Sequence, residues 1–388
     1  MESLPLTNAS IWRHTLSPAD QSELERDDGL AHARPDVLVV GGGIVGLATA
    51  YFLATQKKSV LLIEANTLGA GATAAAAGGI WPSDQGPHHP PAFQPLALRS
   101  RDLWGRLSLK PDFDIDWRVN GFLTVNPNRF RNDAVAFAHE AQEAGYTVHA
   151  VDAEQITHLE PQLRPGLSAG IHCASDAHLN PLKAAASFAR ASRRLGARFA
   201  VRTEFVSSKR VGAHVVEVQT SRGPCSPGQV VICSGALAPV PAHFVRPVSG
   251  QMIATGPLPP LLRGTVGGQF LTLQLKTGEM ITGGTVAEND HQEPDATLSF
   301  QMAQAARELI PALANVPFTQ AWCGIRSATR DGLPIVDRVP DCDNLWISTG
   351  HFRNGLLLAP ATGQLLADWI TTGVCSEELE PLNAARVS

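Results

Sequence analysis

The stretch that decides the fold is DVLVVGGGIVGLATAYFLA, residues 36–54. Its first part, residues 36–40, is a short β-branched apolar run, which predicts a buried parallel strand. A glycine-rich turn at 41–46 is followed by a predicted helix at 47–56 and a second apolar strand at 59–63. The order strand, glycine turn, helix, strand predicts an α/β unit with a parallel sheet.

The spacing G-x-G-x-x-G falls on Gly41, Gly43 and Gly46. In such a unit the first glycine allows the tight turn, the second lets a pyrophosphate approach the backbone, and the third lets the helix pack closely on the strand. The helix N-terminus adds free N–H groups and a positive dipole. Glu64, which closes the second strand, can accept hydrogen bonds from an adenosine ribose and disfavours a 2′-phosphate. The segment predicts one bound dinucleotide, FAD or NAD rather than NADP.

Composition limits the other classes of function. The 388 residues fit two or three domains, or one core with an inserted second sheet, and the net charge of −5 offers no basic field for nucleic acid or an anionic membrane. Six cysteines without a Cys-x-x-Cys pair favour free thiols in a reducing compartment, so we expect a cytoplasmic protein. No signal peptide and no transmembrane helix are expected. Residues 1–35 are polar and aperiodic, with an acidic cluster at 23–28, and we interpret them as a partly flexible extension of unknown role.

The rest of the chain predicts a second sheet. Residues 230–236 form another buried strand of the parallel sheet, and residues 200–220 contain a hairpin. Strand-rich residues between about 245 and 325, together with 119–126, predict a separate antiparallel sheet. Near the C-terminus a strand at 345–350 runs into a glycine loop and a helix, which places a second helix N-terminus near the dinucleotide.

Five segments carry a resemblance to a known family. GHFRNGLLLAPATG, residues 350–363, resembles the C-terminal flavin motif of the FAD-dependent D-amino acid oxidase family, in its glycine oxidase branch of the thiamine-biosynthesis type. The other four are similar to further motifs of that family, over about residues 36–372: VVGGGIVGLATAYFLA, GATAAAAGG, ICSGA and CGIRSATRDGLPIV. Members bind FAD, share a two-domain fold and oxidise amines to imines.

The resemblance implies a Rossmann-like FAD-binding domain with a parallel sheet and a second, substrate domain with a mainly antiparallel sheet. We expect a discontinuous FAD-binding domain over residues 36–85, 150–240 and 325–375. The substrate domain is expected over residues 86–149 and 241–324.

The resemblance also assigns residues to FAD, position by position. The stretch GAGATAAAAGGIWP, residues 69–82, is expected to bind the cofactor, because its small residues leave room for it and expose backbone N–H donors. At the end of this stretch, Gly79-Ile80-Trp81 is expected to lead toward the substrate pocket. The helix beginning near Gly355 would stabilise negative charge on the reduced flavin. The expected cofactor-binding residues are Gly41, Gly43, Ile44, Val45, Gly46, Glu64, Ala65, Ala72, Thr73, Ala77, Gly78, Gly79, Phe205, His351, Phe352, Arg353, Asn354, Gly355, Leu356 and Leu357.

Two arginines are the expected catalytic residues. An amino acid substrate needs its carboxylate fixed, which a guanidinium does with two parallel hydrogen bonds. Arg326 matches the family's carboxylate-binding arginine, and Arg353 matches a second arginine beside the flavin that also reaches the substrate. His351 is not expected to act as a base. Phe270 stands about where glycine oxidases tend to carry a tyrosine, which leaves a bulkier D-amino acid or a secondary amine open as an alternative to glycine.

We expect FAD to be non-covalent. Related sarcosine oxidases attach FAD through a cysteine of this region, but matching Thr329 and Asp331 puts that cysteine at Gly324, one residue from Cys323. Neighbouring side chains of a strand point to opposite faces. His88-His89 has no partner ligands at suitable spacing, so no metal site is expected.

The leading hypothesis is FAD-dependent oxidation of a small amino acid or amine, such as glycine, sarcosine or a D-amino acid. Hydride transfer to flavin N5 would give an imine, then an oxo acid, ammonia and hydrogen peroxide. One alternative is a D-amino acid, D-hydroxyproline or opine-type dehydrogenase that passes electrons to an acceptor other than oxygen. Another is a non-catalytic flavin-binding protein, against which the two arginines argue. No nucleic-acid partner is expected, and the sequence is compatible with a homo-oligomer.

Overall fold

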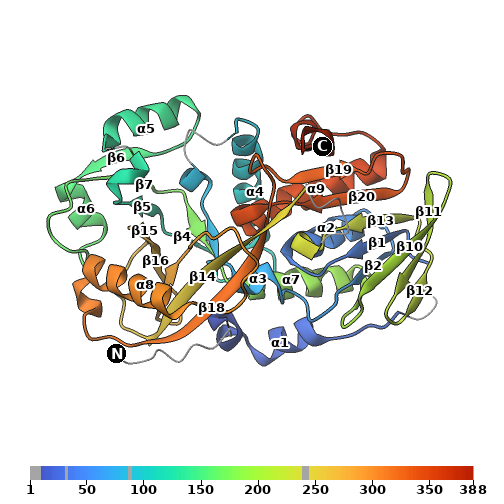
Figure 1. Ribbon diagram of the computed structural model, residues 1–388, viewed down its shortest axis with the longest axis horizontal. Helices are drawn as coiled ribbons and strands as arrows, with labels where there is room; N and C mark the ends of the chain where they lie inside the picture. The colour runs from blue at the N-terminus through green and yellow to red at the C-terminus, as the bar shows by residue number, and fades with distance from the viewer. Residues whose placement is uncertain (1–9, 31–33, 86–89, 131, 238–243, 388) are drawn as a thin grey trace.

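The glycine turn sits at the centre of a six-stranded sheet in the computed structural model (Figure 1). The strand order is β19-β20-β13-β1-β2-β9, parallel throughout except for the antiparallel edge strand β19. Its strands are β1 (Val37–Val40), β2 (Val60–Ile63), β9 (Arg198–Ala200), β13 (Gln229–Ile232), β19 (Ile335–Arg338) and β20 (Leu345–Thr349). The structure describes residues 10–30, 34–85, 90–130, 132–237 and 244–387.

Alternating side chains of β1 face two different layers. Val37 and Val39 belong to a core cluster built with helices, whereas Leu38 and Val40 belong to a cluster shared with a small three-stranded sheet. A strand that is buried on both faces needs apolar residues at every position, which explains why β1 is apolar throughout. The helices on the first face are α2 (Ile44–Thr55), α4 (Phe93–Leu107), α7 (Pro181–Arg194) and α9 (Gly355–Thr372). The small sheet contains β10 (Phe205–Val211), β11 (His214–Thr220) and β12 (Gly223–Cys225), and includes the predicted hairpin.

The second large sheet has eight strands in the order β18-β14-β17-β16-β15-β5-β7-β6. All its neighbours are antiparallel except β5 and β15. This confirms the predicted fold class, a Rossmann-like unit beside a mainly antiparallel sheet. The strands are β5 (Phe122–Thr124), β6 (His149–Asp152), β7 (Ala169–Cys173), β14 (Arg246–Pro257), β15 (Thr265–Gly267), β16 (Leu271–Gln274), β17 (Glu279–Gly283) and β18 (Phe318–Ala328).

Smaller elements complete the two halves. A fourth sheet has the strand order β3-β8-β4, and α8 packs its apolar face on the eight-stranded sheet. Among the described residues, we find no helix with the length and apolar character needed to cross a membrane. The remaining strands and α-helices are β3 (Gly79–Ile80), β4 (Arg118–Val119), β8 (Ala177–His178), α1 (Pro18–Glu25), α3 (Ala72–Ala75), α5 (Ala134–Glu143), α6 (Ala153–Leu159) and α8 (Ala296–Leu309). The short 3-10 segments are η1 (Ile11–Thr15), η2 (Pro82–Gln85), η3 (Pro127–Phe130), η4 (Gly235–Leu237), η5 (Pro311–Leu313), η6 (Phe352–Asn354), η7 (Glu380–Leu382) and η8 (Ala384–Val387).

The expected domain boundaries need correction at three places. β7, and β6 except for His149, were expected in the FAD-binding part but pair within the eight-stranded sheet. α4 was expected in the substrate part, yet Trp104 and Leu96 on its apolar face join the core cluster of the parallel sheet. β18 runs unbroken across the expected boundary at 324/325. An apolar stripe shows that an element is buried, but it does not show against which sheet. The rest of the division remains a proposal.

The N-terminal extension is ordered where the structure describes it. In residues 10–30, Ile11, Trp12 and Leu24 are buried in the same core as α2 and α7. Ser17 caps α1, and Pro18 occupies its first turn. Residues 10–30 thus pack against the core, although their few apolar residues are too widely spaced to form a periodic pattern in the sequence.

Two helical glycines provide a test of the packing between α2 and α9. A Cβ on Gly363 of α9 would lie 2.8 Å from backbone atoms of Ala48 and Thr49 in α2, so Gly363→Ala forces the helices apart. We expect a loss of about 1–3 kcal/mol in the free energy of unfolding, measured by urea denaturation. Gly105 of α4 has no atom nearer than Trp117 at 3.9 Å, so Gly105→Ala is the control and is expected to gain about 0.5 kcal/mol. Equal effects in the two variants would contradict the packing argument.

Candidate active site

The three glycines of the first turn have three different surroundings. A Cβ on Gly41, which has a φ of +109°, would lie 2.6 Å from the carbonyl oxygen of Cys233, the residue after β13. A Cβ on Gly46 would lie 2.0 Å from the Gly41 carbonyl oxygen. A Cβ on Gly43 would meet only the Thr73 hydroxyl, at 3.6 Å. The first and third glycines thus allow close packing, while the second leaves space above the N-terminus of α2.

That space is a cavity of about 1310 Å³ between the two large sheets. Of the residues predicted from the sequence, only Gly46 lies outside its lining, since it packs beneath the turn. The predicted residues that line it are Gly41, Gly43, Ile44, Val45, Glu64, Ala65, Ala72, Thr73, Ala77, Gly78, Gly79, Phe205, Arg326, His351, Phe352, Arg353, Asn354, Gly355, Leu356 and Leu357. Segments from all parts of the chain therefore converge on one site.

Glu64 is held at the rim of the cavity by backbone donors. Its Oε2 accepts a hydrogen bond from the amide of Gly42 at 2.7 Å, and its Oε1 accepts one from the amide of Asn66 at 2.8 Å. Each carboxylate oxygen can accept a second hydrogen bond. The carboxylate is thus fixed in position and keeps the capacity to bind a ribose hydroxyl.

The alanine-rich stretch forms a single helical turn, α3, at the N-terminus of α2. The Thr73 hydroxyl accepts a hydrogen bond from the amide of Ile44 at 3.0 Å. On the opposite side, a Cβ on Gly324 of β18 would lie 2.2 Å from the Cβ of Ala75. Small residues are therefore required on both sides of this contact, and larger side chains would close the cavity.

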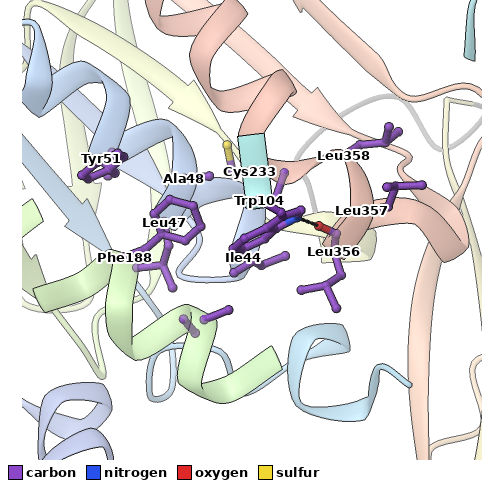
Figure 2. Close-up of a cluster of buried hydrophobic side chains, with 14 of the residues drawn as sticks. Ile44, Leu47, Ala48, Tyr51, Trp104, Phe188, Cys233, Leu356, Leu357 and Leu358 are labelled. Carbon is purple, nitrogen blue, oxygen red and sulfur yellow. Dashed lines mark hydrogen bonds between the residues drawn. The ribbon is translucent and has the colours of Figure 1, made fainter. Parts of the chain in front are cut away.

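The C-terminal segment brings a second helix N-terminus to the cavity. β20 leads through η6 into α9, which begins at Gly355. The indole Nε1 of Trp104 donates to the Leu356 carbonyl oxygen at 2.9 Å. Figure 2 shows Trp104 between the first turn of α9 and Ile44 and Leu47 of α2. The two helix starts that face the cavity thus rest on one buried cluster.

His351, beside this helix start, is buried and uncharged. Burial lowers the pKa of its imidazole to about 3. Its Nε2 lies 3.4 Å from the Thr362 hydroxyl. At neutral pH the side chain is therefore an uncharged packing group.

Arg326 presents a guanidinium at the cavity wall. Its Nη1 donates to the carbonyl oxygens of Ser249, at 3.1 Å, and Thr285, at 2.9 Å. The group lies flat on β14, since a Cβ on Gly250 would lie 2.0 Å from Nη1. Burial, and then the positive charge of Arg353, lower the pKa of Arg326 to about 10, so Arg326 remains cationic at neutral pH. No carboxylate among the described residues forms an ion pair with Arg326.

Cys323 has the properties of a protonated thiol. Burial raises its pKa, and Sγ donates to the His291 carbonyl oxygen at 3.3 Å. All six cysteines are free thiols. Among the described residues, no three His, Cys, Asp or Glu side chains lie close enough to hold a metal ion. His88 and His89 lie outside the described residues.

On the side of the eight-stranded sheet, Trp81 and Phe270 were singled out from the sequence, but the other residues of the cavity wall were not. Trp81 stacks on Phe122 with ring centroids 5.2 Å apart, and both line the cavity together with Phe270. These residues belong to separate strands and loops and form no sequence motif, so only the fold brings them together. Further unpredicted lining residues on this side are Thr124, Asn126, Arg129, Met252, Leu271, Asp290 and Gln292.

Comparison with known proteins gives consistent matches. The family model described as FAD dependent oxidoreductase (DAO) matches residues 36–369. The chain is 30% identical to glycine oxidase of Pseudomonas putida, over 86% of this chain and 94% of that protein. It is 29% identical to glycine oxidase of Bacillus licheniformis, over 91% and 98% respectively. The crystal structure of glycine oxidase from Geobacillus kaustophilus superposes with a TM-score of 0.84 at 27% identity, covering 91% of this chain and 99% of that one.

The buried neutral His351 predicts a loss of stability in acid. The unfolded chain binds a proton near the ordinary pKa of 6.5, whereas the folded chain does so only near 3, so stability falls as the pH drops below 6.5. Between pH 6.5 and 5 this amounts to about 2 kcal/mol. His351→Gln removes the titrating group, and the FAD-free variant is expected to lose correspondingly less stability than the parent over this pH range, measured by urea denaturation. Parallel pH profiles would contradict the burial of a neutral imidazole.

Proposed function

The chain belongs to the FAD-dependent oxidoreductase family, and from this premise we propose that it oxidises a small amino acid at the cavity between its two large sheets. The family membership, the FAD cofactor and the class of reaction predicted from the sequence are confirmed by the family match and by the glycine oxidase relatives. The substrate, the electron acceptor and the roles of individual residues are the proposal.

The residues present fit FAD. The open side of Gly43 and the amides at the start of α2 suit a pyrophosphate, and the anchored Glu64 suits the ribose. Residues 72–79 and the start of α9 at 351–357 would hold the flavin. When bound, FAD supplies the acceptor for the hydride that leaves the substrate and passes the electrons on to oxygen. Because Cys323 is protonated and bonded to His291, we propose that FAD is held without a covalent link.

The observation that carries the proposal is the pair of cationic arginines at the cavity wall. Both residues line the cavity, and the positive charge of Arg353 lowers the pKa of Arg326. No carboxylate of the described residues neutralises Arg326. A substrate carboxylate provides that counter-charge, and Arg326, fixed through Nη1 by two carbonyl groups, can orient it.

The amine is expected to react in its neutral form. His351 is uncharged but buried against Thr362, so it is not placed to take a proton from the substrate. Loss of two electrons and two protons turns the neutral amine into an imine, which water hydrolyses to an oxo acid and ammonia. Oxygen takes up the two electrons and two protons as hydrogen peroxide.

The residues that line the cavity limit which amino acid can be the substrate. The matched relatives are named glycine oxidases, and glycine is therefore the first candidate. Trp81, Phe122 and Phe270 form an apolar wall, which also suits sarcosine or a small D-amino acid. The six free thiols support a cytoplasmic location, which remains a prediction, as does a homo-oligomer.

A substrate screen tests the function. We expect glycine, sarcosine or a small D-amino acid to bleach the bound flavin under anaerobic conditions, and readmitted oxygen to yield hydrogen peroxide. Amines that lack the carboxylate group, such as methylamine for glycine, are the matched controls and are expected to leave the flavin oxidised. Dye reduction without peroxide would replace the oxidase by a dehydrogenase, and a flavin that no amine bleaches would indicate a non-catalytic protein.

Arg326→Ala tests the carboxylate site. Removing the charge-assisted pair is expected to raise KM by about 100-fold while FAD stays bound, measured by steady-state kinetics and by the flavin spectrum. Arg246→Ala is the control, because Arg246 lies on the adjacent strand β14 but pairs with Glu288 at the surface. A KM that is unchanged in Arg326→Ala would remove this residue from the site.

A further inference from the structure

The N-terminal segment, residues 10–30, reaches the cofactor cavity from outside the part of the chain that matches the family. Trp12 is 2% exposed, and its indole Nε1 donates to the Ala76 carbonyl oxygen at 2.7 Å. Ala76 belongs to the loop between α3 and β3, and both Ala76 and the next residue, Ala77, line the cavity. A side chain of the extension is thus bonded directly to the cofactor loop.

A second indole bonds to the neighbouring peptide. Trp322 of β18 donates from Nε1 to the Ala75 carbonyl oxygen at 3.3 Å. Because a trans peptide holds its C=O and N–H on opposite sides, the bond from Trp12 to the Ala76 carbonyl also fixes the Ala77 amide, which points away from Trp12. Ala77 lines the cavity. The two tryptophans therefore set the direction of consecutive peptide groups at the cavity wall.

The ring of Trp12 also covers the next residue of the loop. Gly78 has a φ of +88°, and a Cβ on it would lie 3.3 Å from Cη2 and Cζ2 of Trp12 and 2.4 Å from the Leu179 carbonyl oxygen. The Leu179 amide donates to the Gly78 carbonyl oxygen at 2.9 Å. Residues 76–78 are thus enclosed between the extension on one side and the chain after β8 on the other.

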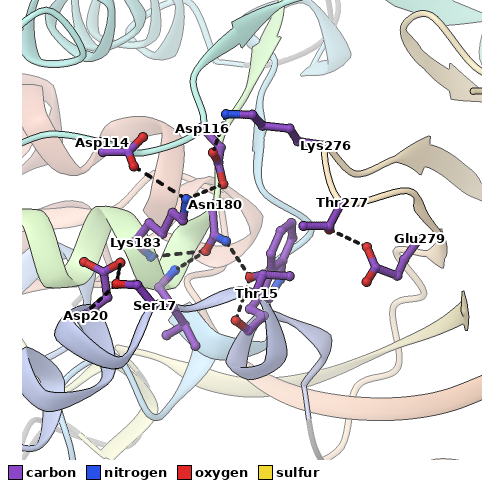
Figure 3. A network of polar contacts seen from close by, with 12 residues as sticks. Thr15, Ser17, Asp20, Asp114, Asp116, Asn180, Lys183, Lys276, Thr277 and Glu279 are labelled. Carbon is purple, nitrogen blue, oxygen red and sulfur yellow. Dashed lines mark hydrogen bonds and ion pairs between the residues drawn. The ribbon is translucent and has the colours of Figure 1, made fainter. Parts of the chain in front are cut away.

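Polar contacts hold the extension itself in place. The Thr15 hydroxyl donates to the Trp12 carbonyl oxygen and accepts from Asn180 Nδ2, each at 2.7 Å (Figure 3). Asn180 is also the N-cap of α7. Further along, Arg193 of α7 donates to Asp28 at 2.7 Å and to the carboxylate of Glu23. The acidic cluster at residues 23–28 therefore anchors the extension to α7, and this anchor helps to hold Trp12 in place although it does not contact Trp12.

We propose that Trp12 is a positioning residue for FAD, and that residues 10–30 act as a clasp that holds the loop at 76–78 in the conformation that binds the cofactor. A loop of alanine and glycine has little side-chain packing of its own, so an external contact must restrict its backbone. The inference requires only that FAD occupies the cavity and does not depend on which amine is oxidised. Its failure is therefore separate from a failure of the proposed substrate.

The test compares two buried tryptophans in FAD-free protein. Trp12→Phe keeps most of the ring and removes the hydrogen bond to Ala76. Trp346→Phe is the matched control, since its indole donates a bond of 2.8 Å to Gln229 at the start of β13. We expect the Kd for FAD, from titration of flavin fluorescence, to rise about tenfold in Trp12→Phe and to stay within about twofold in Trp346→Phe. An unchanged Kd in Trp12→Phe, or equal changes in the two variants, would overturn the proposal.

Hydrogen exchange separates positioning from a general loss of stability. In FAD-free Trp12→Phe, amides of residues 72–81 are expected to exchange faster than in the parent, while those of residues 350–357 at the other helix start are unaffected. A uniform increase in both segments would mean that Trp12 supports only the core. Should Trp12→Phe fail to fold, Thr15→Val breaks the link to Asn180 alone and is expected to raise the Kd for FAD in the same direction by a smaller factor. An unchanged Kd in Thr15→Val would then count against the clasp.

Discussion

The close contact between the start of α2 and β1 is the constraint on which the rest of the structure depends. Gly46 lies so near the Gly41 carbonyl that no side chain fits there, and Gly41 is pressed against β13 in the same way. The helix therefore begins directly at the end of the strand, and its free amides point into the cavity. Since nearly every side chain of α2 is buried, the helix needs apolar partners on all sides, which α7, α9 and α4 supply.

The packing around α2 also brings a second helix N-terminus, that of α9, to the cavity. α9 crosses α2 closely enough to require Gly363, and Trp104 bonds the first turn of α9 while it contacts α2. The two helix N-termini thus share one rigid support, although they are far apart in sequence. Two sets of backbone amides preorganised in this way can stabilise negative charge at two places on one cofactor without rearranging when it binds.

The sequence predicted what is encoded within short segments. Gly41, Gly43, Gly46 and Glu64 form one local motif, and the strand and helix around Gly355 form another, so the fold class and most of the cavity lining could be predicted. The pairing of α4 with α9 and of β6 with β7 could not, because an apolar face such as that of Trp104 is compatible with either half of the molecule. The role of Trp12 was hidden for a related reason. Its partner is a backbone carbonyl, which leaves no trace in the sequence, and the arginines that anchor the acidic cluster lie far along the chain.

The two kinds of anion site in the cavity differ in strength, and this bears on specificity. The helix starts offer partial charges to the cofactor, whereas Arg326 and Arg353 offer full charges that repel each other in a partly buried site. A ligand without a carboxylate leaves Arg326 without a counter-charge from the described residues, which we expect to weaken binding more than a poor fit of a methyl group against Trp81 or Phe122. We therefore expect discrimination to be strict for the α-carboxylate and tolerant for the side chain. With carboxylate binding assigned to the arginines in our proposal, phenylalanine in place of tyrosine at position 270 is expected to broaden the range of amino acids accepted.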